Sequence, residues 1–102
     1  MVNAIVNGFE YEYWRGISTD WSIVSYYKVP KERQFLIKGT ESVVTSVKVT
    51  VDKRAENVKF IHEILLLNQN GVACPRVNCK ENLLEYDAII NDIEKLFNFK
   101  EA

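Results

Sequence analysis

The most reactive side chains of this 102-residue sequence belong to two cysteines and one histidine. Cys74 and Cys79 are spaced C-x4-C, whereas a structural zinc site usually has a C-x2-C pair and two further ligands. His62 is the only histidine, so a four-ligand site would need carboxylates as well. We therefore expect no metal and no cofactor. Two packed free thiols are the favoured interpretation of the cysteines, and a disulfide across a strand-to-helix corner is the alternative.

No constellation of residues predicts catalysis. His62 lies in an apolar stretch and has no evident partner that would make it the base for a nucleophile. A helix predicted near the C-terminus carries four carboxylates on the side expected to face solvent, namely Glu85, Asp87, Asp92 and Glu94. The four glycines form neither a P-loop nor a G-x-G-x-x-G motif. The chain is therefore predicted not to be an enzyme.

Aromatic residues are the most informative feature, because six of them fall within seventeen residues. They are Tyr11, Tyr13, Trp14, Trp21, Tyr26 and Tyr27. Part of this set should be core, and exposed tyrosines and tryptophans are enriched at protein interfaces. Four basic residues lie between positions 15 and 33, so nucleic-acid bases stacking on a basic platform is a competing interpretation. We take all six rings as candidate partner-binding residues.

Charge is nearly balanced overall but unevenly distributed. The net charge of −1 argues against a dedicated nucleic-acid-binding protein. Residues 28–54 nevertheless hold seven basic and three acidic side chains, and residues 81–102 hold six acidic and two basic ones. The two regions can attract each other, or their counterparts in a second copy. A nucleic-acid accessory role for residues 28–54 is therefore the alternative function, and a homodimer is one form that a protein partner could take.

Length and composition are those of one globular domain covering residues 1–102, with 47% hydrophobic and 26% charged residues. No basic segment followed by an apolar one predicts a signal peptide. No apolar run approaches the roughly 20 residues of a membrane span. We expect an intracellular location, in the cytoplasm or, for a viral protein, the host cytoplasm, and no membrane partner.

The strongest structural signal is the amphipathic pattern of residues 80–98, which predicts a helix. At about 100° per residue, its apolar side chains fall in one arc of roughly 140°. They are Leu83, Tyr86, Ile89, Ile90, Ile93, Leu96 and Phe97. A face this wide needs a complementary surface, which the rest of the chain must supply as a sheet.

The N-terminal region predicts a β-hairpin with strands at about 2–6 and 9–14. Asn7-Gly8 joins two β-prone runs, and both residues of such a turn need positive φ. The period of two places Phe9, Tyr11 and Tyr13 on one face of the second strand and Trp14 on the other. Because one helix covers only one face, either Trp14 or the Tyr11–Tyr13 pair should stay exposed.

The middle of the chain reads mostly as strands, at 34–38, 42–51 and 58–69, and Gly16 should end the strand before them. Residues 21–28 fit either a helix or a strand, and possible N-caps at 18–20 favour a short helix that Val29-Pro30 would end. Asn70-Gly71 predicts a second hairpin, with residues 72–77 as the returning strand. Pro75 would place that strand at an edge of the sheet.

Together these elements predict an α+β fold, with an antiparallel sheet of five to six strands and the C-terminal amphipathic helix packed on one face. An offset of 63 residues superposes Asn7-Gly8 on Asn70-Gly71 and aligns a strand, a turn, a strand and a helix in each half. An internal duplication, with units starting near 1–28 and 63–98, is one explanation of this pattern.

In size and residue usage, with nine Asn, nine Ile and five Tyr, the chain resembles small orphan proteins of filamentous viruses of archaea from hot acidic habitats. The resemblance covers no motif, and it implies a protein without a known catalytic site. Together with the aromatic cluster, it favours a non-enzymatic module that binds a protein or peptide through an aromatic surface or an exposed strand edge.

Overall fold

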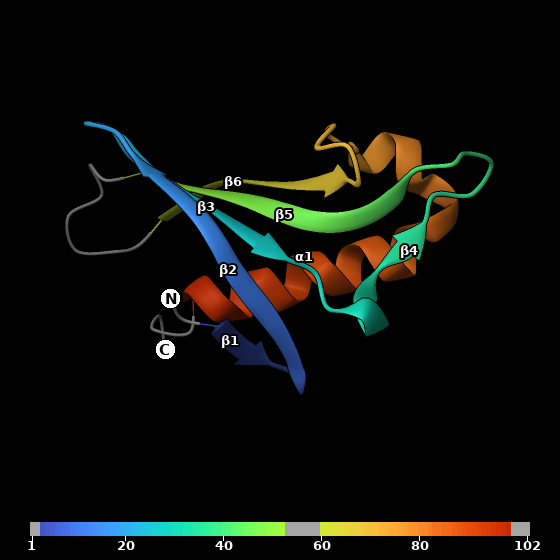
Figure 1. Ribbon diagram of the computed structural model, residues 1–102, viewed down its shortest axis with the longest axis horizontal. Helices are drawn as coiled ribbons and strands as arrows, with labels where there is room; N and C mark the ends of the chain where they lie inside the picture. Colours follow the sequence, from blue (N-terminus) through green and yellow to red (C-terminus); the bar gives the residue numbers. More distant parts are fainter. Residues whose placement is uncertain (1–2, 53–59, 99–102) are drawn as a thin grey trace.

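The computed structural model describes residues 3–52 and 60–98 and confirms the α+β fold. One antiparallel sheet curves over the C-terminal helix, which lies against one of its faces (Figure 1). The strands are β1 (Asn3–Val6), β2 (Phe9–Ser18), β3 (Ser22–Lys28), β4 (Phe35–Leu36), β5 (Val43–Asp52) and β6 (Phe60–Asn68). The helices are the 3₁₀ segments η1 (Lys31–Arg33) and η2 (Arg76–Asn82) and the α-helix α1 (Leu83–Asn98).

Strand β5 is the centre of the sheet. Along residues 46–52 it pairs with β3, which pairs in turn with β2, and β2 pairs with β1. Beyond the end of β3, the same edge of β5 pairs with the short strand β4 through Val43 and Val44. β6 pairs with the opposite edge of β5. The sheet is therefore interrupted between β3 and β4, where the chain leaves it at Val29-Pro30.

The core lies between the sheet and the apolar side of α1, as the helical periodicity predicted. Tyr86, Ile89 and Ile93 are buried in one cluster with residues of β2, β5 and β6. Burying each such side chain is worth roughly 1.5–3 kcal/mol. Leu84, which lies outside the predicted arc, is 88% exposed. Asp92 contradicts the prediction, because it is fully buried rather than facing solvent.

The first Asn-Gly turn forms as predicted. Asn7 has a φ of 54° and Gly8 a φ of 83°, the left-handed values that a two-residue hairpin turn needs. The expectation that Gly16 ends the next strand is wrong, because β2 continues to Ser18. The glycine instead makes room for a ring, since a Cβ at Gly16 would lie 1.8 Å from the hydroxyl oxygen of Tyr13.

The helix favoured for residues 21–28 is also wrong, because residues 22–28 form strand β3. This segment pairs with β2 on one edge and with β5 on the other, so it forms hydrogen bonds to two strands. Its β-prone residues suit this position in the sheet. Thr19, one of the possible capping residues, instead closes the β2–β3 turn, where its N–H donates to the Ser22 carbonyl at 2.8 Å.

The second Asn-Gly turn does not lead into the expected returning strand. After it, only Ala73 bridges to Leu67, and η2 begins at Arg76. Gly71 has a φ of 78°, but Asn70 does not have positive φ. The Gly71 N–H donates to the Asn68 carbonyl at 2.9 Å, and the side-chain oxygen of Asn68 also accepts from the N–H groups of Asn70 and Val72. The internal duplication stays a prediction, and its first unit ends in a strand where the second ends in a helix.

Candidate partner-binding groove

Three of the six predicted aromatic residues lie on the face of the sheet that α1 covers. Tyr11 is fully buried, and the half-buried rings of Tyr13 and Tyr27 pack edge to face with centroids 5.5 Å apart. Tyr27 also contacts Phe97 of α1, at 6.1 Å between centroids. Trp21 lies at the turn between β2 and β3 and is 64% exposed. The predicted set is therefore not one surface: Tyr11 is part of the core, Tyr27 packs against it, and Tyr13 packs on Tyr27.

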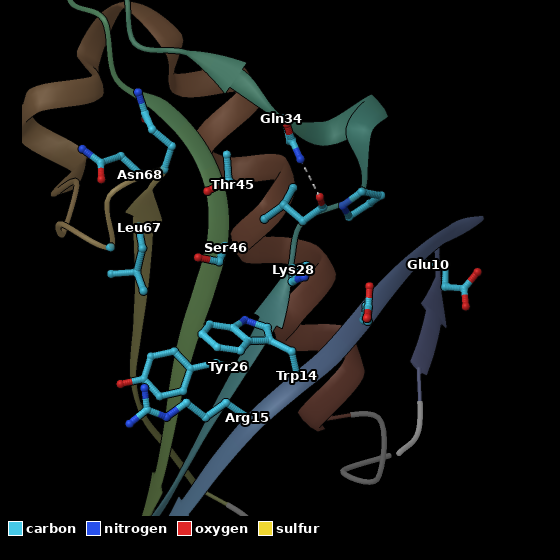
Figure 2. A pocket seen from close by; sticks show the side chains of 15 residues that line it. Glu10, Trp14, Arg15, Tyr26, Lys28, Gln34, Thr45, Ser46, Leu67 and Asn68 are labelled. Carbon is cyan, nitrogen blue, oxygen red and sulfur yellow. Dashed lines mark hydrogen bonds between the residues drawn. The ribbon is translucent and has the colours of Figure 1, made fainter.

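A β-bulge brings the other two rings together on the open face. Tyr13 of β2 pairs with Tyr27 of β3, and the next pair in the register is Arg15 with Tyr26. Trp14 is the extra residue, so it and Arg15 both reach the Tyr26 ring (Figure 2). The ring centroids of Trp14 and Tyr26 are 5.7 Å apart, and Arg15 Cζ lies 5.4 Å from the centroid of Tyr26. Trp14 stays 43% exposed.

These side chains line an open groove of about 650 Å³ (Figure 2). The groove exists because β3 ends at Lys28 and the chain turns away at Val29-Pro30, which leaves a gap between β2 and the start of β5. The backbone beside this gap is already paired. The Gln34 side-chain Nε2 donates to the Val29 carbonyl at 3.0 Å, and the Val29 N–H donates to the Thr45 carbonyl at 2.9 Å. The groove is therefore preformed.

Cationic side chains surround the aromatic end of the groove. The strand register places Tyr26 between Arg15 of β2 and Lys48 of β5, so one ring has a cation on each side. Within the part of the chain that the structure describes, neither cation forms an ion pair. This end of the groove therefore presents uncompensated positive charge beside an aromatic surface.

Carboxylates line the groove further toward the start of β2. Glu10 and Glu12 are exposed lining residues, and Glu12 stands opposite Lys28 across the strands. Glu10 accepts a hydrogen bond from Asn3 Nδ2 at 2.7 Å. Because Lys28 offsets only one of the two glutamates, this end of the groove keeps negative charge. The groove is therefore bipolar along β2.

A second polar feature, a buried cluster around Asp92 of α1, lies on the covered face of the sheet. Asp92 accepts hydrogen bonds from Asn7 Nδ2 at 2.6 Å, the Tyr11 hydroxyl at 2.5 Å, Arg33 Nε at 2.8 Å and Arg33 Nη2 at 3.2 Å. The Arg33 guanidinium also lies 4.2 Å from the centroid of the Phe9 ring. One carboxylate thus joins α1 to the β1–β2 turn, to β2 and to η1.

The pKa shifts in this cluster follow from those contacts. Burial by itself would raise the pKa of Asp92, but the hydrogen bonds from Arg33, Tyr11 and Asn7 outweigh it and hold that pKa below its ordinary value. Burial and the hydrogen bond to Asp92 raise the pKa of Tyr11. Every buried side-chain polar atom of the described residues has a hydrogen-bond partner. We therefore interpret the cluster as a structural clamp.

Sequence reasoning missed this cluster because its members are far apart in the chain. Arg33 and Tyr11 are 59 and 81 residues from Asp92. On a wheel of about 100° per residue, Asp92 lies roughly 40° beyond the edge of the apolar arc. That position is not a sufficient signal of burial, because Asp87 lies equally far beyond the opposite edge of the arc and is exposed. It could not reveal which cation would lie opposite.

The remaining candidate residues from the sequence lie outside the groove, or their side chains are not among those that the structure describes. Cys74 and Cys79 are free and buried, and burial raises the pKa of both thiols. The side chain of His62 is not among those described. In residues 3–52 and 60–98, no three His, Cys, Asp or Glu side chains gather as a metal site. No helix in the same ranges is long and apolar enough to cross a membrane.

The basic stretch at 28–54 does not form one surface. Arg33 is bound to the buried carboxylate of α1, and Lys38 lies 3.5 Å from a glutamate of η2. Lys28 and Lys48 belong to the open face, and residues 53 and 54 lie outside the described ranges. Of the described cations of this stretch, Lys28 lines the groove, Lys48 lies one strand away on the same face, and Lys31 belongs to η1.

Sequence and structure comparisons add no relative from which a role could be transferred, so the groove has to be interpreted from its own chemistry. Comparison with protein-family models, with curated proteins and with solved structures finds no match to this chain.

Proposed function

We propose that this chain is a non-enzymatic module that binds an extended segment of a protein partner in the groove on the open face of the sheet. The observation that supports this most is the group formed by Trp14, Tyr26 and Arg15, in which a large ring stays 43% exposed although its neighbours hold it in place. Trp, Tyr and Arg are the residue types that carry most of the energy of protein interfaces. The proposed setting is intracellular, where the two thiols stay reduced.

The form of the site favours an extended segment. The groove runs over strands, and an extended peptide lying on strands directs alternate side chains toward them. An exposed indole surrounded by polar residues is also the usual arrangement of an interface centre with its rim. A second copy of the chain is one protein that could supply such a segment, and sedimentation at increasing concentration would detect it.

The alternative, a nucleic-acid accessory role, has weaker support. Polyanion binding depends on a surface whose cations are not offset. On the open face the register places three cations, which are Arg15, Lys28 and Lys48, and four carboxylates, which are Glu10, Glu12, Asp52 and Glu63. Phosphates on this face would therefore meet at least as many like charges as opposite ones.

A peptide selection tests the proposal. A phage-displayed library of random peptides is selected on the wild-type protein, and the enriched peptides are titrated against Trp14→Ala and Trp21→Ala. We expect Trp14→Ala to lose at least about tenfold in affinity, as for an interface centre. Trp21→Ala should bind like the wild type, because it removes an exposed tryptophan of the same hairpin from outside the groove.

Two outcomes would contradict the proposal. Enriched peptides that bind Trp14→Ala as tightly as the wild type would show that the groove is not the site. A single-stranded oligonucleotide that binds more tightly than any peptide, with an affinity that falls steeply as salt rises, would favour the alternative function.

A further inference from the structure

We propose that the partner segment is zwitterionic, with one basic and one acidic side chain four residues apart and an apolar side chain midway between them. This inference rests on the proposed function and specifies the chemistry of its partner. It follows from the separation of charge along β2, from the exposed ring between the two ends, and from the spacing of residues in an extended strand.

The glutamate end of the groove fits a cation. Glu10 and Glu12 are exposed and line the groove on the same side of β2 as Trp14. A Lys or Arg side chain placed here pairs with a carboxylate. Lys28 stands opposite Glu12 and leaves Glu10, whose described partner is a neutral amide, to set the sign of this end.

The other end fits a carboxylate. Arg15 and Lys48 flank Tyr26 in one row across three strands, and neither forms an ion pair with a described residue. An acidic side chain placed beside Tyr26 would accept charge-assisted hydrogen bonds from one or both cations. Arg15 lies over the Tyr26 ring at 5.4 Å, and this contact favours the same position before the partner arrives.

The distance between these ends sets the spacing in the partner. Glu10 and Glu12 precede Arg15 by five and three residues, which corresponds to about 10–16 Å along a strand. In an extended segment, residues i, i+2 and i+4 point to one side, and i and i+4 lie about 13 Å apart. A basic residue at i and an acidic residue at i+4 therefore match the two ends. The residue at i+2 then lies on Trp14 and should be apolar.

The sign pattern also excludes segments of uniform charge. An all-acidic segment would place one carboxylate against Glu10 and Glu12, and an all-basic segment would place one cation against Arg15. Like charges brought together in this way weaken binding and so select among partners. Side-chain contacts alone do not fix the direction of the segment, so basic-x-apolar-x-acidic and its reverse are both accepted.

Three blocked peptides test the charge pattern, with the sequences Gly-Lys-Ser-Leu-Ser-Glu-Gly, Gly-Lys-Ser-Leu-Ser-Lys-Gly and Gly-Glu-Ser-Leu-Ser-Glu-Gly. The protein carries Trp21→Phe, so that Trp14 is its only tryptophan and reports binding by fluorescence. The zwitterionic peptide should bind about threefold to tenfold more tightly than either of the others, as expected for exposed charge pairs gained against like charges avoided.

Charge reversal in the protein provides the matched controls. Arg15→Glu should shift the preference to the Lys-Lys peptide, and Glu12→Lys should shift it to the Glu-Glu peptide. A variant that failed to fold would lose binding of all three peptides, so a changed preference reports recognition. When Trp14 is also replaced by Ala, the change in peptide preference should disappear. Binding to these double variants is followed by NMR, because they lack the reporting tryptophan.

The outcomes separate this inference from the proposed function. Equal affinities of the three peptides, or no binding of any while Trp14-dependent peptides emerge from the library, would overturn the charge pattern and leave the function standing. Binding that does not depend on Trp14 would overturn both. Tightest binding of the Glu-Glu peptide to the unreversed protein, together with competition by a single-stranded oligonucleotide, would indicate a polyanion site.

Discussion

Helix α1 makes two Arg–Asp pairs of nearly the same geometry in opposite surroundings. On the side facing the sheet, Arg33 donates to Asp92 over 2.8 and 3.2 Å. On the outer side, Arg76 donates to Asp87 over 3.0 and 2.9 Å. The Asp92 side chain is fully buried, whereas about half of the Asp87 side chain is exposed. Two Arg–Asp pairs whose aspartates are five residues apart on one helix therefore lie in different environments, one buried and one exposed.

The surroundings of such a pair decide what it contributes to stability. In water, an ion pair replaces good solvation and gains little. In the core, the carboxylate has already lost its solvation, so each donor that satisfies it becomes necessary. The buried pair also links segments that are far apart in sequence, whereas the exposed pair links η2 to the helix that directly follows it.

Removing one charge from each pair should change stability strongly at Asp92 and hardly at Asp87. Asp92→Asn should lower the free energy of unfolding by about 3–5 kcal/mol, because it leaves the Arg33 charge beside a neutral amide. Asp87→Asn should leave the midpoint of a denaturant titration almost unchanged. Similar losses in both variants would contradict the distinction. Adding Arg33→Met to Asp92→Asn should recover part of the loss, since the unpaired charge is then gone.

The apolar residues of α1 extend the comparison to packing. Ile93 is fully buried, whereas Leu84 is 88% exposed. Ile93→Ala should cost about 2–5 kcal/mol through lost transfer free energy and a cavity. Leu84→Ala should cost clearly less in the same titration. Equal costs would mean that the assignment of the two sides of the helix is wrong.

The third prediction concerns the loss of stability at low pH. The pKa of Asp92 is lowered in the folded protein, so the unfolded chain binds the proton more readily. The stabilisation is therefore complete above the ordinary aspartate pKa of about 3.9 and is lost as pH falls through the lowered pKa. Denaturant titrations at about 0.15 M salt, at several pH values below 5, should show a shallower decline for Asp92→Asn than for the wild type. Asp87→Asn should change the decline less than Asp92→Asn does, because an exposed ion pair contributes little to stability. If the stability of Asp92→Asn fell with pH as steeply as that of the wild type, Asp92 would not be the cause of the acid sensitivity.

Sequence patterns predicted those parts of the molecule whose determinants are local. The arc of α1 depends on helical periodicity, and the first hairpin depends on Asn7-Gly8. Strand β3 was missed because its choice over a helix depends on pairing with both β2 and β5. Strand alternation predicted that either Trp14 or the Tyr11–Tyr13 pair would stay exposed, without deciding between them. The contact of Trp14 with Tyr26 depends on a bulge that no residue type indicates.

The groove and the buried cluster needed information that neither composition nor spacing contains. The groove exists because β3 ends at Lys28, opposite Glu12, whereas β2 extends further in that direction, to Phe9. This difference in length is a property of the sheet as a whole. Predicting the cluster would have required knowing which cation lies opposite Asp92 once the chain has folded. Both features arise from contacts between distant segments, and a single sequence read by local pattern does not specify those contacts.

The smallest predicted effect uses the two Asn-Gly turns, which have the same sequence and different conformations. Asn7 has a φ of 54°, donates to Asp92 and accepts from Lys95 Nζ at 3.0 Å, whereas Asn70 does not have positive φ. Asn7→Gly should cost about 1 kcal/mol for the lost hydrogen bonds. Asn7→Ala should cost about 1 kcal/mol more, because alanine is strained at this φ.

At Asn70 the order should reverse, because alanine is not strained there and glycine loses more conformational freedom on folding. The four variants are compared by denaturant titration at neutral pH, where the Asp92 carboxylate is ionised. If alanine were worse than glycine at both positions, the second turn would have to resemble the first in solution. If glycine were worse at both, the left-handed conformation of Asn7 would not limit the choice of residue. Only opposite orders agree with a first turn that combines backbone conformation with the buried carboxylate and a second turn closed by hydrogen bonds to Asn68.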